Sequence, residues 1–271
     1  MLRAAFVITL LAYMGATFFY LAALTSTRRS LEKAGYWCLL VGFVLHVVST
    51  GARYVHSGFI PITSLHESLS FLALCMGGFL IYLMKTYRTG LLGGIVLPAI
   101  SIVLIWALTQ PYEIKPLPPV LDSYWMPFHT VFAFLGNAIF FTAFLVSIVY
   151  LVVERQIKKK KLHSHSARLP SLETLDLINY RCISYGFPFL TLGIITGSLW
   201  AQLAWGSYWS WDPKETWSFI TWIVYAVILH NRLTMGWRGR KTAYMMILGF
   251  VSIVVTFLGV NFIVGGLHSY L

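Results

Sequence analysis

Eight long runs without a charged residue constrain this chain more than any other feature of its sequence. A helix needs about 20 consecutive apolar residues to cross the hydrocarbon core of a bilayer. Only 11% of the residues are charged and 58% are hydrophobic, which does not fit a soluble domain. We therefore expect an all-α, polytopic integral membrane protein with about eight transmembrane helices. The runs lie at roughly 4–25, 34–52, 68–84, 89–110, 128–153, 182–204, 216–230 and 242–267.

The basic residues alternate from one loop to the next. Of the 20 lysines and arginines, all but four fall in the first, third, fifth and seventh loops between these runs. The exceptions, Arg3, Arg53, Lys115 and Lys214, occur singly on the other side. The positive-inside rule then places the odd loops in the cytoplasm and both termini on the outer, periplasmic face. The net charge of +11 is explained by cytoplasmic loops facing anionic lipid, so no nucleic-acid partner is expected.

The start of the chain and the cysteines exclude several classes of protein. The first run has only Arg3 before it and is too long for the apolar core of a cleaved signal peptide, so none is expected. Cys38, Cys75 and Cys182 are isolated, with no CxxC and no CxxCH spacing. We therefore expect neither a dithiol relay nor a covalently attached haem, and we interpret the cysteines as apolar packing residues. The sequence also contains no nucleotide-binding glycine loop.

The segment 205–218, WGSYWSWDPKETWS, concentrates four tryptophans in the predicted outer loop before the seventh run. Trp205 and Trp209 are four residues apart, so on a helix they would share one face, with Tyr208 and Trp211 beside it. Such a surface offers flat apolar area for a porphyrin. The alternative, an aromatic belt at the membrane interface, explains neither this density in one loop nor the glycine and carboxylates within it.

Three residues inside the same segment form a pattern typical of a helix start. Asp212 suits the N-cap, Pro213 the first helical position and Glu215 the third position of a capping box. The seventh helix is therefore expected to begin near Pro213. This capping role is an alternative to ligand contact for both carboxylates.

Ionisable residues within membrane helices are costly and suggest function. His129 opens the fifth run and His268 closes the eighth, both on the predicted outer face. Two neutral imidazoles converging there would suit the axial positions of a haem iron, although a hydrogen-bonded interfacial role is the alternative for each. His230 lies at the predicted inner end of the seventh run. His66 and Glu67 precede the third run, and for them the sequence leaves two alternatives open, namely that they line a pocket or that they pack against neighbouring helices.

The tryptophan-rich segment resembles the "WWD" signature of the haem-handling proteins of cytochrome c biogenesis. The surrounding sequence is similar to the CcsA/ResC branch of system II in that family. The resemblance covers about 60–270, while the first sixty residues match only in hydropathy. It implies N-terminal transmembrane helices at 1–60 and a haem-handling cytochrome c assembly domain at 61–271, with the signature at about 205–218. The similar segments are 121–130, 175–206, 218–232 and 259–270.

The resemblance also implies a set of haem-binding residues. It makes His129 and His268 the axial ligands of an outer, non-covalently bound haem b, and His230 a ligand in an inner site. No catalytic residue is implied beyond those that position the haem. The implied contact surface consists of Trp205, Gly206, Tyr208, Trp209, Trp211, Asp212, Pro213, Glu215 and Trp217.

The function implied by the resemblance is delivery of haem across the membrane and its presentation for thioether attachment to apocytochrome c. The chain would act as the WWD subunit of a cytochrome c synthase, or haem lyase, with a ResB (CcsB) partner and thiol reductants supplied by other proteins. The alternatives are a haem exporter or chaperone of the CcmC type, which has fewer spans, and a structural scaffold. The expected location is a bacterial plasma or inner membrane with the active face periplasmic, and a thylakoid membrane is the alternative.

Overall fold

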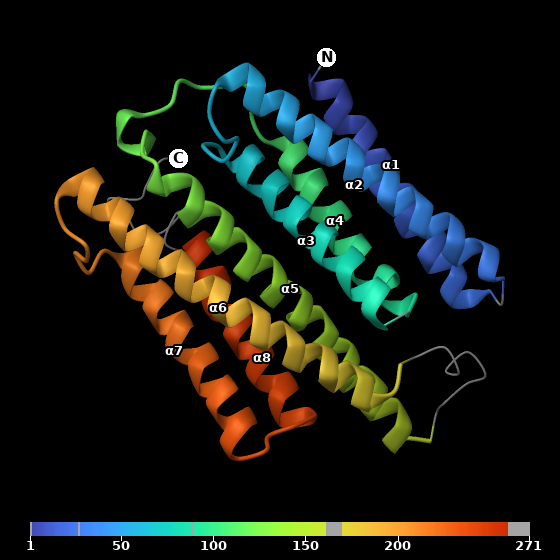
Figure 1. The fold of residues 1–271 in the computed structure, drawn as a ribbon. Helices are drawn as coiled ribbons and strands as arrows, with labels where there is room; N and C mark the ends of the chain where they lie inside the picture. Colours follow the sequence, from blue (N-terminus) through green and yellow to red (C-terminus); the bar gives the residue numbers. More distant parts are fainter. Residues whose placement is uncertain (1, 27, 88, 161–169, 260–271) are drawn as a thin grey trace. The chain divides into compact units, whose positions relative to one another are not determined.

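The computed structural model describes residues 2–26, 28–87, 89–160 and 170–259. Within these ranges the chain is helical and contains no strand, which confirms the expected all-α fold (Figure 1). Two short elements, η1 (Pro119–Leu121) and the π-helical η3 (Val255–Gly259), accompany the long helices. The long helices are α1 (Leu2–Thr25), α2 (Arg29–Ser57), α3 (Leu65–Tyr87), α4 (Leu91–Thr109), α5 (Trp125–Lys158), α6 (Leu172–Trp205), α7 (Pro213–Thr234) and α8 (Arg240–Val254).

Seven helices of the described chain are long and apolar enough to cross a membrane, the last of them counted through η3 to Phe257. Helix α7 is not among them. Its uncharged middle is short, because Lys214 and Glu215 occupy its first turn and Arg232 its last. The polytopic membrane class is therefore confirmed, whereas the number of crossings and the orientation of the termini stay predictions.

The chain divides into two compact units. Unit 1 comprises residues 1–115 and 153–171, and contains α1 to α4. Within it α1 lies against α2 and α4, and α3 lies against α4 and α2. In a bilayer such helices associate through close packing rather than through burial from water. The predicted boundary near residue 60 concerns the family domain rather than this division, and it stays a prediction.

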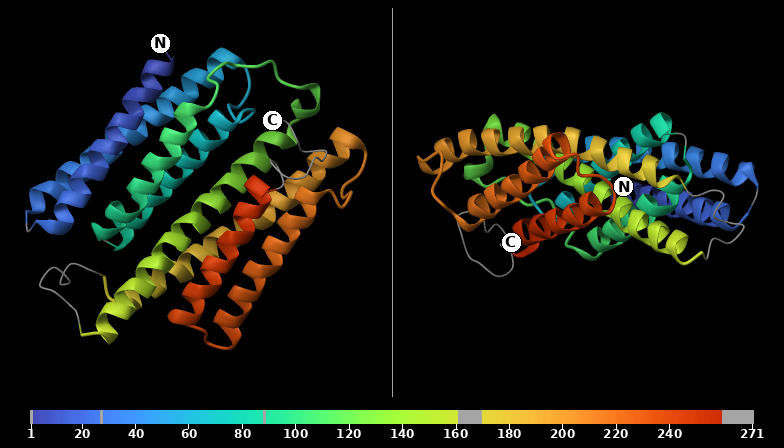
Figure 2. Two further views of the ribbon diagram at one scale, coloured as in Figure 1. Left: turned by 180° about the vertical axis from the view of Figure 1, so that it is seen from behind. Right: turned by 90° about the horizontal axis from the view of Figure 1, so that it is seen from below.

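Unit 2 comprises residues 116–152 and 172–271. Helix α7 lies between α6 and α8, and the pair α7 and α8 runs side by side in Figures 1 and 2. Helix α5 contributes Phe140, whose ring stacks on that of Tyr225 of α7 at a centroid distance of 3.5 Å. Trp222 of α7 donates its indole N–H to the Thr191 hydroxyl of α6 at 2.9 Å. These contacts fix α7 within the unit.

An ion pair joins the start of α6 to the end of α7. Asp176 accepts two hydrogen bonds from the Arg232 guanidinium, at 2.7 and 2.6 Å, and a third from the Gly239 N–H at 2.6 Å. Arg232 also donates to the Trp237 carbonyl at 3.2 Å and lies over the Tyr180 ring. One carboxylate therefore holds α6, α7 and the connection to α8 together.

Replacing Asp176 with alanine should destabilise the protein strongly. The side chains of Asp176 and Arg232 are only 14% and 9% exposed, so the variant leaves a cation with little water around it, at a cost of about 3–5 kcal/mol. Thermal unfolding in detergent measures the effect. Glu154→Ala is the matched control, because its partner Lys158 is 61% exposed and such a surface pair contributes at most about 1 kcal/mol. Equal shifts for the two variants would contradict the prediction.

Candidate functional site

The tryptophan-rich segment does not continue α6. Helix α6 ends at Trp205, and Gly206 adopts a φ of +78°, with its N–H donating to the Gln202 carbonyl at 3.0 Å. Glycine occupies this left-handed conformation without steric cost and ends the helix there. The expectation that Trp205 and Trp209 share one helical face is therefore wrong, because Trp209 lies in the loop beyond α6.

The predicted capping box at the start of α7 is confirmed. Asp212 accepts from the Lys214 N–H at 2.9 Å, and Glu215 accepts from the Asp212 N–H at 3.3 Å, with Pro213 at the first helical position. Glu215 also accepts from the N–H of Ser210 at 2.8 Å and from its hydroxyl at 3.2 Å. Both carboxylates are buried, so their shown role is to fix the loop at the start of α7.

The aromatic side chains of the loop beyond Gly206 project from this fixed base. Trp209 meets Trp211 edge-on at 5.8 Å and Phe219 edge-on at 6.1 Å. Tyr208 and Trp211 are largely exposed, at 56% and 67%, while Trp217 is half-buried. The loop therefore presents an aromatic surface, but this surface is formed by irregular backbone.

His129 lies in the second turn of α5 and faces α6. Its Nδ1 lies 2.8 Å from the Gly193 carbonyl oxygen. Since a carbonyl can only accept, Nδ1 carries the proton and the lone pair of the neutral ring is on Nε2. The imidazole stacks on the Trp200 ring at 6.0 Å, and Trp205 meets Trp200 edge-on at 4.9 Å. Trp200 thus connects His129 to the first tryptophan of the signature.

Sequence reasoning missed Trp200 and Gly197. Trp200 is 2% exposed and donates its indole N–H to the Val120 carbonyl at 3.0 Å, which fastens the segment before α5. A Cβ at Gly197 would lie 2.6 Å from Nδ1 of His129, so only glycine leaves room for this ring. The spacing of Gly193 and Gly197, four residues apart, is the signal that could have indicated a close helix contact.

His230, another predicted haem ligand, does not lie near His129. His230 lies in the last turns of α7 with an exposed side chain, 17 positions after Pro213 and so roughly 25 Å along the helix from the capping box. His129 and His230 are therefore found toward opposite ends of unit 2. His268 lies outside the described residues.

Trp211 has an unusual backbone conformation. Its φ is +59°, a region that bulky residues rarely occupy and that costs about 1–3 kcal/mol. The Thr216 hydroxyl donates to its carbonyl at 3.2 Å, and the buried cap at Asp212 follows directly. The cap therefore holds an exposed tryptophan in a strained position, a feature that clusters at binding sites.

Trp211→Gly should raise the melting temperature in detergent, because glycine adopts a positive φ without strain and the ring is largely solvent-exposed. The expected gain is about 1 kcal/mol. Tyr208→Gly is the matched control: it removes an exposed aromatic residue from the same loop without a positive φ and should lower stability slightly. A lower melting temperature for Trp211→Gly would show that its conformation stores no strain.

The remaining residues singled out in the sequence have structural partners. Glu67 forms an ion pair with Arg53 at 2.6 Å, and His66 donates from Nδ1 to the Ala107 carbonyl at 2.8 Å. Cys75 and Cys182 are buried, in agreement with a packing role, whereas Cys38 is partly exposed.

Comparison with known proteins identifies the family. The family model described as "Cytochrome C assembly protein" matches residues 62–268. The "Cytochrome c biogenesis protein CcsA" of Guillardia theta is 38% identical over 93% of this chain and 90% of its own length. The proteins of the same name from Microcystis aeruginosa and Chlamydomonas reinhardtii are 39% and 41% identical, over 81% and 85% of this chain and 82% and 66% of their own lengths. The chain therefore belongs to the cytochrome c assembly protein family, as a protein of the CcsA type.

Proposed function

We propose that this chain acts in cytochrome c maturation by binding haem b as cargo and presenting it for covalent attachment to apocytochrome c. It would do so as the WWD subunit of a system II cytochrome c synthase. The observation that carries the proposal is the His129 imidazole, which is oriented by the Gly193 carbonyl and connected to the tryptophan-rich loop through Trp200. Membership of the cytochrome c assembly family supports the same role.

His129 fits the requirements for an axial ligand of haem iron. A ligating histidine usually donates the N–H of its second ring nitrogen to a carbonyl or carboxylate. This hydrogen bond fixes the tautomer and makes the nitrogen that binds the metal more basic. The Gly193 carbonyl supplies this contact, and Nε2 then supplies the lone pair. His268 is proposed as the second axial ligand. Bis-histidine ligation would hold the iron while the loop leaves the edge of the porphyrin accessible.

Chemistry at this site would consist mainly of positioning. Thioether formation adds each cysteine S–H of a CxxCH segment across a haem vinyl group, so no electrons are gained or lost in the addition. The exposed rings of Tyr208 and Trp211 would support the porphyrin face, and the buried cap at Asp212 and Glu215 would keep these rings in place. Holding the reacting groups in register is itself a large contribution to rate.

His230 is proposed to serve a separate, inner haem site. Its side chain is exposed on α7, so a ligand from another chain can reach the same iron. We propose a ResB (CcsB) subunit as that partner, with the active face of the complex outward from a bacterial plasma or inner membrane.

Co-purification with the ResB partner from haem-replete cells tests the proposal. We expect a bis-histidine haem spectrum and, when a reduced CxxCH peptide of apocytochrome c is added, conversion to the thioether-linked product. Haem that binds but never transfers would favour an exporter or chaperone of the CcmC type. A complex without haem would favour a structural scaffold.

His230→Ala should lower the haem content of the outer site several-fold while leaving the outer pocket itself intact, because this residue is far along α7 from His129. Haem added to the purified complex should therefore restore the outer spectrum. His56→Ala, which removes another exposed helical histidine, is the control and should have no effect. Failure of added haem to bind the His230 variant would place His230 in the outer pocket instead.

A further inference from the structure

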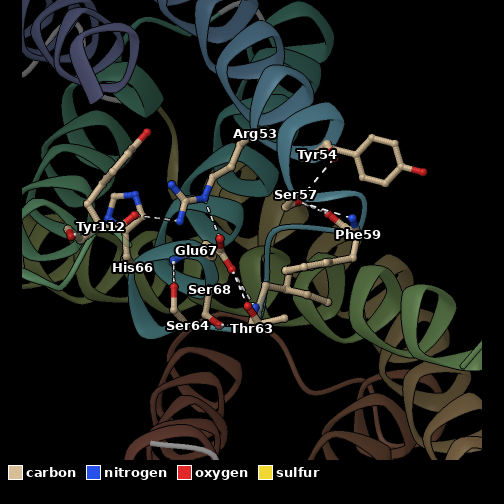
Figure 3. A network of polar contacts seen from close by, with 12 residues as sticks. Arg53, Tyr54, Ser57, Phe59, Thr63, Ser64, His66, Glu67, Ser68 and Tyr112 are labelled. Carbon is tan, nitrogen blue, oxygen red and sulfur yellow. Dashed lines mark hydrogen bonds and ion pairs between the residues drawn. The ribbon is translucent and has the colours of Figure 1, made fainter. Parts of the chain in front are cut away.

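Unit 1 buries its own polar cluster at the end where α2 connects to α3 (Figure 3). Arg53 of α2 donates from Nε to Glu67 of α3 at 2.6 Å and from Nη2 to the Tyr112 carbonyl at 3.0 Å, and its guanidinium lies 4.5 Å from the Tyr112 ring centre. The second oxygen of Glu67 accepts from both the N–H and the hydroxyl of Thr63, each at 2.9 Å. Glu67 is therefore fully engaged, and the pair is neutral overall.

Two groups in this cluster keep unused hydrogen-bonding capacity. Nη1 of Arg53 is buried and has no partner among the described residues. His66, which is 2% exposed, donates from Nδ1 to the Ala107 carbonyl, so its lone pair is on Nε2. Both residues line a cavity of about 20 Å³, which is room for one water molecule. The cavity thus offers a water both a donor and an acceptor.

The polar lining continues from this cavity along the interior of unit 1. Ser70 of α3 lines the cavity, and its hydroxyl oxygen lies 3.0 Å from Nε2 of His46 on α2. Ser49 lines the cavity as well, and His46, Ser49 and Arg53 fall at helical spacing on one buried face of α2. His46 is completely buried, and its Nδ1 has no partner among the described residues.

Beyond His46 lies a third buried polar atom that has no hydrogen-bond partner among the described residues. The Tyr13 ring of α1 meets the His46 ring edge-on at 5.8 Å, and its buried hydroxyl has no partner among the described residues. Leaving polar groups unsatisfied within a membrane-embedded unit is unfavourable. Arg53, His46 and Tyr13 follow one another in space, so internal water is the simplest way to satisfy all three.

We propose that unit 1 contains a hydrated proton path that leads from the Arg53–His66 cavity through Ser70 to His46. The cavity water would take up a proton from bulk water and pass one to the Ser70 oxygen as the Ser70 hydroxyl donates its own to Nε2 of His46. The imidazolium formed in this way would release its Nδ1 proton to a water beside the Tyr13 hydroxyl, which leaves a neutral imidazole protonated on Nε2. One proton enters from water and one returns to water, and no electron moves.

The surroundings of His46 make its charged form short-lived. Burial disfavours the imidazolium, and the groups that face the ring are His66, the Tyr13 phenol and the Arg53–Glu67 pair, whose charges cancel. A buried hydroxyl with a purely structural role bonds within its own helix, whereas the Ser70 hydroxyl contacts His46 of a different helix. Ser147, for example, donates to the Ala143 carbonyl one turn earlier in its own helix. The path does not depend on haem, so the proposed function and this inference can fail separately.

Water-to-imidazole proton exchange in the full chain tests the proposal. Haem-free protein with ¹⁵N-labelled histidine is placed in liposomes, and the His46 signal is identified by its loss in His46→Gln. We expect the His46 N–H to exchange with water within seconds, and Ser70→Ala to slow this exchange at least tenfold. Ser147→Ala is the control, since it removes a buried hydroxyl from another helix and should leave the His46 rate unchanged.

Two outcomes would overturn the proposal. No exchange of the His46 N–H with water over a day would show that the interior of unit 1 is dry. Equal rates in wild type and Ser70→Ala would show that the hydroxyl relays nothing. Ser70→Ala should fold normally because alanine is the better helix former, and an unchanged melting temperature checks this.

Discussion

Replacing His129 with alanine should abolish formation of holocytochrome c in cells that produce the complete synthase. The variant removes the imidazole that the Gly193 carbonyl and the Trp200 ring hold in place, so under the proposed function the iron would lose an axial ligand. Exogenous imidazole should restore part of the activity, because a free ring can refill the space that alanine leaves. The measurement is the amount of thioether-linked haem in a reporter cytochrome c, with and without imidazole.

The control for this experiment is His56→Ala, which removes an exposed histidine near the end of α2 and should keep full activity. His268→Ala is expected to behave as His129→Ala does, including the rescue by imidazole. Normal holocytochrome formation by His129→Ala would exclude axial ligation by this residue. Loss of activity without any rescue, together with a lowered melting temperature, would point to a role in the α5–α6 contact instead.

Local patterns in the sequence predicted the helices and the start of α7 well. Uncharged runs identify membrane helices because the bilayer core tolerates no unsatisfied backbone. The capping box at Asp212 and Glu215 was equally predictable, since all of its hydrogen bonds are made within a few residues. The path of the chain at Trp209 was not predicted, because one glycine conformation at Gly206 overrides the four-residue spacing of the tryptophans.

Contacts between distant segments could not be predicted from the sequence. The stacking of His129 on Trp200 joins residues 71 positions apart, and only the packing of α5 against α6 brings them together. Similarly, the ion pair with Glu67 shows why Arg53 can lie among apolar runs. The sequence around neither residue predicts that the two form a pair. A charge that looks isolated in a membrane sequence is thus a reason to expect a partner from a neighbouring helix.

Gly197→Ala should lower holocytochrome formation about 10- to 100-fold without unfolding the protein. The added Cβ would lie 2.6 Å from Nδ1 and 2.8 Å from Cε1 of His129, so the ring must move and its hydrogen bond to the Gly193 carbonyl is lost. Losing the partner that orients a ligating histidine has effects of this size. Alanine is more favourable than glycine in a helix interior by about 1 kcal/mol, so the substitution should not destabilise α6 itself.

The control is Gly15→Ala, which adds the same methyl group to a helix position where no side chain or neighbouring helix of the described residues lies within 4 Å, and which should leave activity unchanged. The double variant His129→Ala/Gly197→Ala distinguishes positioning of His129 from a separate effect on haem. Both variants are assayed with imidazole, because His129→Ala alone should form no holocytochrome. If Gly197 acts only by making room for the His129 ring, the double variant should then be no less active than His129→Ala. Independent losses that multiply would mean that Gly197 leaves room for the porphyrin itself. In that case imidazole would rescue His129→Ala but not the double variant, since the added methyl group would still exclude the haem.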